Sequence, residues 1–260
     1  MLAERGLAVS PAAPNVLRPQ LYRDALARLS PRPLKRAAAA LVIPDYAVRM
    51  AILDFEEFPA GEEERIALLR FRLRKTVPFH IEAAQLSYSI QVEQAKQIEV
   101  LAVAIARPIL EEYEGIFADA GYRVGLVTPS SIAALRLCAG AEKGLTLLAK
   151  AAGSTLSVLL LEQNRVRLVR CLDLASPEEE NTREELSVLP LLQQTVAFAE
   201  DQIGQPVARL LLCGFGTDTD ALGRIAQREF GTPYGTVRSK FGAPAQENTG
   251  LLGLVEQYAA

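Results

Sequence analysis

Short apolar runs of strand length alternate along this chain with longer segments that have the spacing of amphipathic helices. Strand-like runs occupy residues 37–45, 47–55, 84–92, 97–106, 123–129, 147–170 and 208–216, and helical segments lie between most of them. Proline or glycine marks most of the boundaries. This alternation, with two antiparallel hairpins included, predicts an α/β fold in which helices cover a mixed sheet. We expect strand 47–55 to be the neighbour of strand 37–45, with a turn at Asp45 and Tyr46.

Charge and hydropathy exclude several functional classes. The 260 residues carry a formal net charge of −3, which gives no general attraction to nucleic acid. No apolar run approaches the roughly 18 residues of a membrane-spanning helix. The start of the chain, MLAERGLAVSPAAPNV, lacks the apolar core of a signal peptide. We therefore expect a cytosolic protein with no membrane span.

Cysteine and histidine usage argues against a transition-metal site and against a histidine-based catalytic triad. Cys138, Cys171 and Cys213 are widely spaced and form no C-x-x-C pair, and His80 is the single histidine. Buried thiols in a reducing compartment are the expected state of these cysteines. From the sequence we assign no metal ligand and no catalytic residue.

Residues 147–170, LLAKAAGSTLSVLLLEQNRVRLVR, are expected to form two strands around a polar turn, entered through a small-residue stretch that ends in Gly153, Ser154 and Thr155. The backbone N–H groups of such a stretch, together with hydroxyl donors, can hold a phosphate. The magnesium that accompanies a nucleotide prefers oxygen ligands, yet no Asp or Glu lies between Gly144 and Leu161. A turn that serves only packing is therefore the alternative interpretation.

A second candidate site is CGFGTDTD, residues 213–220, where a buried strand ends in a Gly-x-Gly turn before a helix. Gly214, Gly216 and Thr217 would place a ligand at the carboxyl end of that strand. A lone Gly-x-Gly is weak evidence, and Asp218 or Thr219 can simply cap the helix.

A third candidate is the basic end of the helix expected over residues 61–77. Its acids lie in the first turn and its bases in the last, as the helix dipole favours. Arg72, Arg74, Lys75 and the nearby Phe79 are our candidate contacts for an acidic or peptide partner. A solvated helix face, with Phe79 in the core, is the alternative interpretation.

The order of these segments resembles the type IV pilus assembly protein PilM family, which is actin-like and akin to the cell-division protein FtsA. The stretches LVIPDYAVRMAILDFEEFP and RFRLRKTVPFHIEAAQLSYSI carry the resemblance most specifically, and it extends over roughly residues 6–258. It implies an actin-like, ribonuclease H-like α/β fold with mixed sheets. Residues 1–44 would be a remnant of the first actin-like subdomain, residues 45–128 a small inserted α+β subdomain, and residues 129–260 a reduced second subdomain.

The chain departs from that family at three parts of the nucleotide site. The first phosphate loop has no counterpart in the opening residues, the acid expected before the second phosphate turn is absent, and about fifteen residues (173–187) replace a further subdomain. The resemblance therefore implies a degenerate relative with a vestigial nucleotide site at Gly153, Ser154, Thr155, Gly214, Gly216 and Thr217. ATP and magnesium are not expected as cofactors.

The function implied by the resemblance is a non-catalytic cytosolic adaptor beneath the inner membrane. Its partner would be the cytosolic tail of a single-pass pilus assembly protein, PilN in PilM systems. One alternative is an actin-like ATPase that binds and hydrolyses ATP. Another is the cytosolic part of a type II secretion platform protein, which normally carries a membrane span after this domain.

Overall fold

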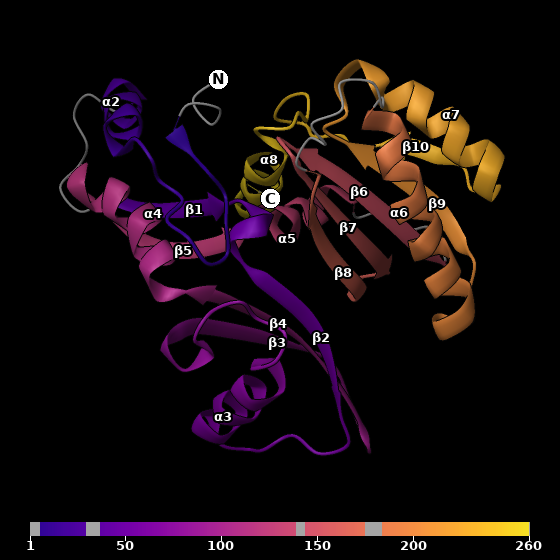
Figure 1. Cartoon of the computed structure of the whole chain (residues 1–260), viewed down its shortest axis with the longest axis horizontal. Coiled ribbons are helices and arrows are strands. Elements are labelled where there is room, and N and C mark those ends of the chain that lie inside the picture. The colour runs from indigo at the N-terminus through magenta and orange to yellow at the C-terminus, as the bar shows by residue number, and fades with distance from the viewer. Residues whose placement is uncertain (1–5, 30–36, 139–143, 175–183, 260) are drawn as a thin grey trace. The chain divides into compact units, whose positions relative to one another are not determined.

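The computed structural model describes residues 6–29, 37–138, 144–174 and 184–259. The chain divides into two compact units, Met1–Pro129 (unit 1) and Ser130–Ala260 (unit 2). Each unit has its own sheets and apolar core, so each is described by itself (Figure 1). The three-segment division at residues 44 and 128 remains a prediction.

The first part of unit 1 is a parallel pair of strands, β1 (Ala37–Ile43) and β5 (Tyr122–Pro129). Helix α4 (Arg107–Asp119) packs on this pair, and helix α2 (Pro19–Leu29) adjoins α4 through the ion pair between Arg23 and Asp119. Apolar residues from β1, α4 and the 3₁₀ turn Asp45–Ala47 form the local core. Helix α4 ends at Asp119, and Gly121, two residues later, has the positive φ of 86° that is typical after a helix.

The second part of unit 1 is a three-stranded antiparallel sheet in the order β2-β4-β3. Its strands are β2 (Arg49–Phe55), β3 (Ala84–Gln94) and β4 (Gln97–Ala106). Helix α3 (Glu62–Leu73) and the 3₁₀ turn Ile81–Ala83 pack on one face of this sheet. Leu69 and Leu73 of α3 are fully buried there against Val100 and Ala102 of β4.

The strand pairing of unit 1 differs from the expectation. Strand β2 does not pair with β1; it pairs with β4, and β1 pairs with β5. The 3₁₀ turn at 45–47 leads the chain out of the first sheet instead of reversing it into a hairpin. Strand β5 also pairs outside the range 45–128, because its partner β1 lies before residue 45.

Unit 2 is built on a five-stranded sheet in the order β10-β9-β6-β7-β8. Strands β6, β9 and β10 run parallel, and β7 is antiparallel to both β6 and β8. The bounds are β6 Leu145–Ala152, β7 Thr155–Glu162, β8 Arg165–Asp173, β9 Val207–Cys213 and β10 Tyr234–Thr236. Strands β8 and β10 are therefore the edges of this sheet.

Helices cover both faces of that sheet. On one face, α6 (Glu184–Phe198), continued by the π-helical turn Ala199–Ile203, and α7 (Thr219–Phe230) enclose a core of leucines from β6, β7 and β9. On the other face lie α8 (Thr249–Tyr258) and α5 (Ser130–Ala134), which the 3₁₀ turn Leu135–Cys138 follows. Helices α5 and α8 pack closely because Gly253 of α8 has no side chain that would collide with the Ala133 carbonyl of α5.

Two local expectations for unit 2 are corrected. Residues 147–170 belong to three strands, because the turn at Gly153 and Ser154 is itself a hairpin between β6 and β7. Pro190 favours a helix that begins near it, but in the structure it lies inside α6, which begins earlier, at Glu184. Both errors arise because small residues and proline mark possible breaks without fixing which break the chain makes.

Candidate functional site

The two glycine turns predicted from the sequence lie at the same end of the five-stranded sheet, where β6 and β9 finish. Strands β6 and β9 are parallel neighbours, with Lys150 opposite Cys213, so the turns that follow them leave the sheet side by side. Gly214 has a φ of 82°, and a Cβ there would lie 2.2 Å from the Ala151 carbonyl oxygen. Only glycine therefore allows the two strand ends to approach this closely.

A cavity of about 440 Å³ opens beside the second glycine turn. Its walls come from the end of β9, the start of α7 and the segment 236–247. Gly214, Gly216, Thr219, Val237 and Gln246 are among its lining residues. This position, at the carboxyl ends of parallel strands, is where α/β sheets commonly bind ligands.

Gln246 connects the first glycine turn to this cavity. Gly153 has a φ of 58°, and its N–H donates to Gln246 Oε1 at 3.3 Å. The N–H that a phosphate would accept from is thus already bonded to a side chain of the protein. The structure therefore brings Gly153, Gly214 and Gly216 to one site.

Three other candidates do not line the cavity. Thr155 is buried at the start of β7, the Ser154 carbonyl accepts a hydrogen bond from the N–H of Leu174, and the hydroxyl of Thr217 donates to Asp218. Of the hydroxyl donors expected to assist phosphate binding, that of Thr155 is therefore buried and that of Thr217 is bonded to Asp218.

The face of the sheet that α8 covers carries a polar row beneath these turns. Cys213, Lys150, Ser157 and Cys171 lie opposite one another on β9, β6, β7 and β8. Lys150 is 1% exposed, and the thiol of Cys213 lies 2.9 Å from the Thr249 hydroxyl. Burial raises the pKa of Cys213, and the Thr249 hydrogen bond and the Lys150 charge oppose that rise. In this row, the neutral thiol of Cys213 therefore lies beside the buried Lys150.

One carboxylate near the turns was missed in the sequence. Asp173 ends β8 directly opposite Thr155, so it lies on the same face as Lys150. The signal was obscured by a β-bulge between β7 and β8, which shifts the register by one residue beyond Leu160. Counting back from the turn at 163–164 without the bulge places Leu172 opposite Thr155.

These residues do not fit a magnesium-bound triphosphate. Within the described ranges, no cluster of three or more His, Cys, Asp or Glu side chains is arranged to hold a metal ion. Lys150 lies on the same sheet face as Asp173 and opposes binding of a divalent cation there.

The basic candidates on α3 have structural roles that the sequence did not show. The Arg72 guanidinium lies 5.0 Å from the centre of the Phe55 ring and donates to the Asp54 carbonyl. Arg74 forms an exposed ion pair with Glu82. Of the remaining two candidates, Phe79 packs against the core of the three-stranded sheet, whereas Lys75 is exposed to solvent.

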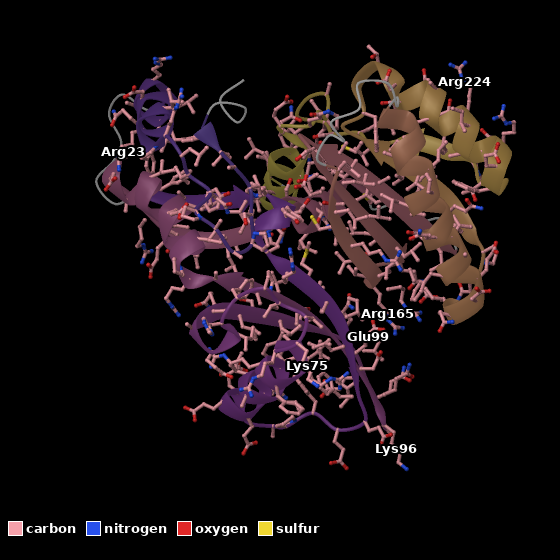
Figure 2. All side chains as sticks on the ribbon, viewed as in Figure 1. Arg23, Lys75, Lys96, Glu99, Arg165 and Arg224 are labelled. Carbon is pink, nitrogen blue, oxygen red and sulfur yellow. The ribbon has the colours of Figure 1, made fainter. Side chains whose placement is uncertain are left out.

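An exposed aromatic residue on the same helix was also missed. Phe71 has 69% of its surface exposed, whereas Leu69 and Leu73 on the opposite side of α3 are buried. Helical periodicity would have found it, because Phe71 lies half a turn away from both buried leucines. Lys75, labelled in Figure 2, is exposed in the turn that follows α3.

With this sheet in unit 2, helices on both of its faces and a glycine turn after two adjacent strands, the chain has an actin-like fold. Among solved structures, the PilM–PilN type IV pilus biogenesis complex contains a chain of the same fold. That chain is 17% identical, the match covers 98% of this chain and 89% of that one, and the TM-score is 0.76. The resemblance to PilM read from the sequence is therefore confirmed for the fold.

Two further structures share the fold less closely. The cytoplasmic domain of EpsL, an inner-membrane component of the Vibrio cholerae type II secretion system, is 11% identical, covers 95% of this chain and 83% of its own, and has a TM-score of 0.51. A Bacteroides thetaiotaomicron protein with an actin-like ATPase fold is 13% identical, covers 88% and 80%, and scores 0.50. No protein-family model and no curated protein matches the sequence. Among the described helices, none is both long and apolar enough to cross a bilayer.

Proposed function

We propose that this chain is a non-catalytic cytosolic adaptor in type IV pilus assembly, associated with the inner membrane through its partner. That partner is the cytosolic tail of a single-pass, PilN-like membrane protein. The observation that carries the proposal is the fold match over 98% of the chain to the PilM–PilN complex, at a TM-score of 0.76. A binding role is further supported by the glycine turns, whose donors and charges do not suit a magnesium-bound triphosphate.

The outer edge of β2 is the proposed binding surface for an extended tail. Within the described residues β2 pairs on one side only, with β4. The Asp54 carbonyl points away from β4, because it accepts a hydrogen bond from Arg72. In an antiparallel strand the N–H and C=O of one residue point the same way, so Ile52 also presents both groups at this edge. A tail added here would gain main-chain hydrogen bonds and pass the Arg72 guanidinium.

The test is binding of a synthetic tail peptide to the full chain, followed by fluorescence polarisation without nucleotide. The peptide is the cytosolic N-terminus of a PilN-like single-span protein. We expect saturable binding that Ile52→Pro weakens at least tenfold, because proline removes an N–H from the outer edge without breaking the ladder to β4. Arg72→Gln should also weaken binding, and Arg224→Gln on α7 is the matched control that should not. No binding at any accessible concentration would refute the proposal.

A second function is supported by the 440 Å³ cavity, which has the position of a nucleoside site in an α/β sheet. This alternative is an actin-like ATPase that binds and hydrolyses ATP. Isothermal titration with ATP and magnesium distinguishes the two, and we expect no heat of binding at high micromolar ligand. Thr219→Arg is the variant that would test binding in the cavity, because Thr219 is the first residue of α7 and lines the cavity. Gly214→Asp is unsuitable, because any side chain there collides with the Ala151 carbonyl.

A further inference from the structure

The outer face of α3 carries exposed residues at helical spacing. Ala67 and Phe71 are four residues apart, and Glu63 and Glu64 lie one turn before them. Arg74, the C-cap, and Lys75 follow the last helical residue, Leu73. All six side chains are exposed, so they form one stripe, which we call the α3 stripe (residues 63, 64, 67, 71, 74 and 75). The stripe is acidic at one end, apolar in the middle and basic at the other.

This charge order makes the stripe complementary to itself. When two copies of α3 pack antiparallel, moving toward the N-terminus of one helix means moving toward the C-terminus of the other. Placing Phe71 of each copy against Ala67 of the other therefore places Glu64 opposite Arg74 and Glu63 opposite Lys75. The large Phe71 thus meets the small Ala67, and opposite charges meet at both ends of the stripe. A two-fold symmetric contact requires this kind of self-complementary surface.

We propose that the α3 stripe is a self-association surface, at which two copies of this chain form an antiparallel helix pair. The present partners of these residues allow it. Inside the described ranges no ion pair engages Glu63, Glu64 or Lys75, and the ion pair of Arg74 with Glu82 is exposed on both sides. Such exposed pairs contribute little to stability and exchange readily.

The size of the contact indicates a weak dimer. One pair of 12-residue helices buries less than the roughly 1,200 Å² at which stable interfaces begin. Association would therefore depend on a high local concentration, such as many copies held beneath one membrane. The inference concerns the outer face of α3 and does not rest on the proposed binding of a tail at β2.

A zero-length carbodiimide cross-link tests the geometry directly, because it joins a carboxylate only to an amine in contact with it. Within one chain, Glu63 and Lys75 are 12 residues apart, about 18 Å along a helix, so they cannot be joined. A cross-link between the peptides that contain Glu63 and Lys75 therefore reports two copies. Mixing ¹⁴N- and ¹⁵N-labelled protein at about 0.5 mM verifies this by mass spectrometry, and we expect mixed-isotope links.

Variants separate this contact from other encounters. Phe71→Ala leaves the reactive pair in place and should lower the yield of cross-linked dimer by about tenfold, because a symmetric contact loses two interactions at once. Glu63→Lys or Lys75→Glu alone removes one of the two reactive groups and should abolish the link. The double variant Glu63→Lys/Lys75→Glu restores opposite charges and should restore the yield. Arg224→Glu, an equally exposed basic residue on α7, should leave the yield unchanged.

Three results would overturn the proposal. One is the absence of any cross-link between residues 63 and 75 of different copies. Another is a double variant as poor as the single ones, which would show that the two charges do not face each other. The third is a carbodiimide cross-link from Lys75 to added tail peptide, with no cross-link between two copies of the chain. That result would assign this face to the membrane partner.

Discussion

Gly253→Ala is expected to destabilise unit 2, although alanine is the better helix former. A Cβ at position 253 would lie 2.1 Å from the Ala133 carbonyl oxygen and 2.9 Å from Ala134 Cα. Real Cβ contacts are not shorter than 3.0 Å, so α5 and α8 must separate by about 1 Å. Overpacking of this kind costs about 1–3 kcal/mol, whereas the gain in helix propensity is about 1 kcal/mol.

Because the collision at 2.1 Å is with backbone, the cost lies at the upper end of that range, about 2–3 kcal/mol, and the expected net loss is about 1–2 kcal/mol of unfolding free energy. For a chain of this size it corresponds to a fall of about 3–6 °C in the melting temperature. The matched control is Gly115→Ala in the middle of α4, where no atom lies within 4 Å of the added Cβ. That variant should be more stable by about 0.5–1 kcal/mol, since only the propensity term remains.

Circular dichroism follows the thermal unfolding of both variants. Hydrogen exchange of peptides from unit 2 shows whether the loss is local to α5 and α8, since two units can unfold separately. A Gly253→Ala protein as stable as wild type, with unchanged exchange in α5 and α8, would refute the close approach of these helices.

Three further predictions concern other parts of unit 2. Gln246→Ala should speed hydrogen exchange at the Gly153 amide while changing the melting temperature little, because one exposed hydrogen bond is lost. Hydrogen bonds from Arg167 and Gln205 hold the pKa of Glu162 below its usual value against the opposing effect of burial. The stabilisation of the folded state by ionised Glu162 is therefore present above about pH 4.3 and is lost as pH falls through the folded-state pKa. In urea titrations, Glu162→Gln should lower the free energy of unfolding by about 0.5–1 kcal/mol at pH 7 and leave it unchanged at about pH 2–3. Burial raises the pKa of Cys138 to about 12, so iodoacetamide at pH 8 should leave it unmodified until unfolding, as peptide mass spectrometry would show.

Local sequence patterns predicted most helices and strands but not all of their partners. Apolar periodicity with Pro and Gly boundaries located α3, β3 and β4 to within a few residues. The pairing of β1 with β5 was not predictable in this way, because about eighty residues separate the two strands and alternation carries no information about the partner. The same limit explains the expectation of two strands in residues 147–170, where Gly153 begins a hairpin turn.

The candidate sites show the same distinction between local and long-range information. Gly214 and Gly216 were found because glycine after a buried strand indicates a special backbone conformation, and both have positive φ. Gln246 was not found, since it reaches Gly153 from a segment far along the chain. Phe71 was predictable from helical periodicity, whereas the stacking of Arg72 on Phe55 depends on the tertiary fold.

The edges of the five-stranded sheet influence how this protein behaves when crowded. Strand β10 has only three residues, and β8 carries arginines at positions 165, 167 and 170. Short and strongly charged edges discourage the open-ended stacking of sheets that leads to insoluble aggregates. At high protein concentration, these two outermost strands should therefore keep the larger sheet from pairing with strands of other chains.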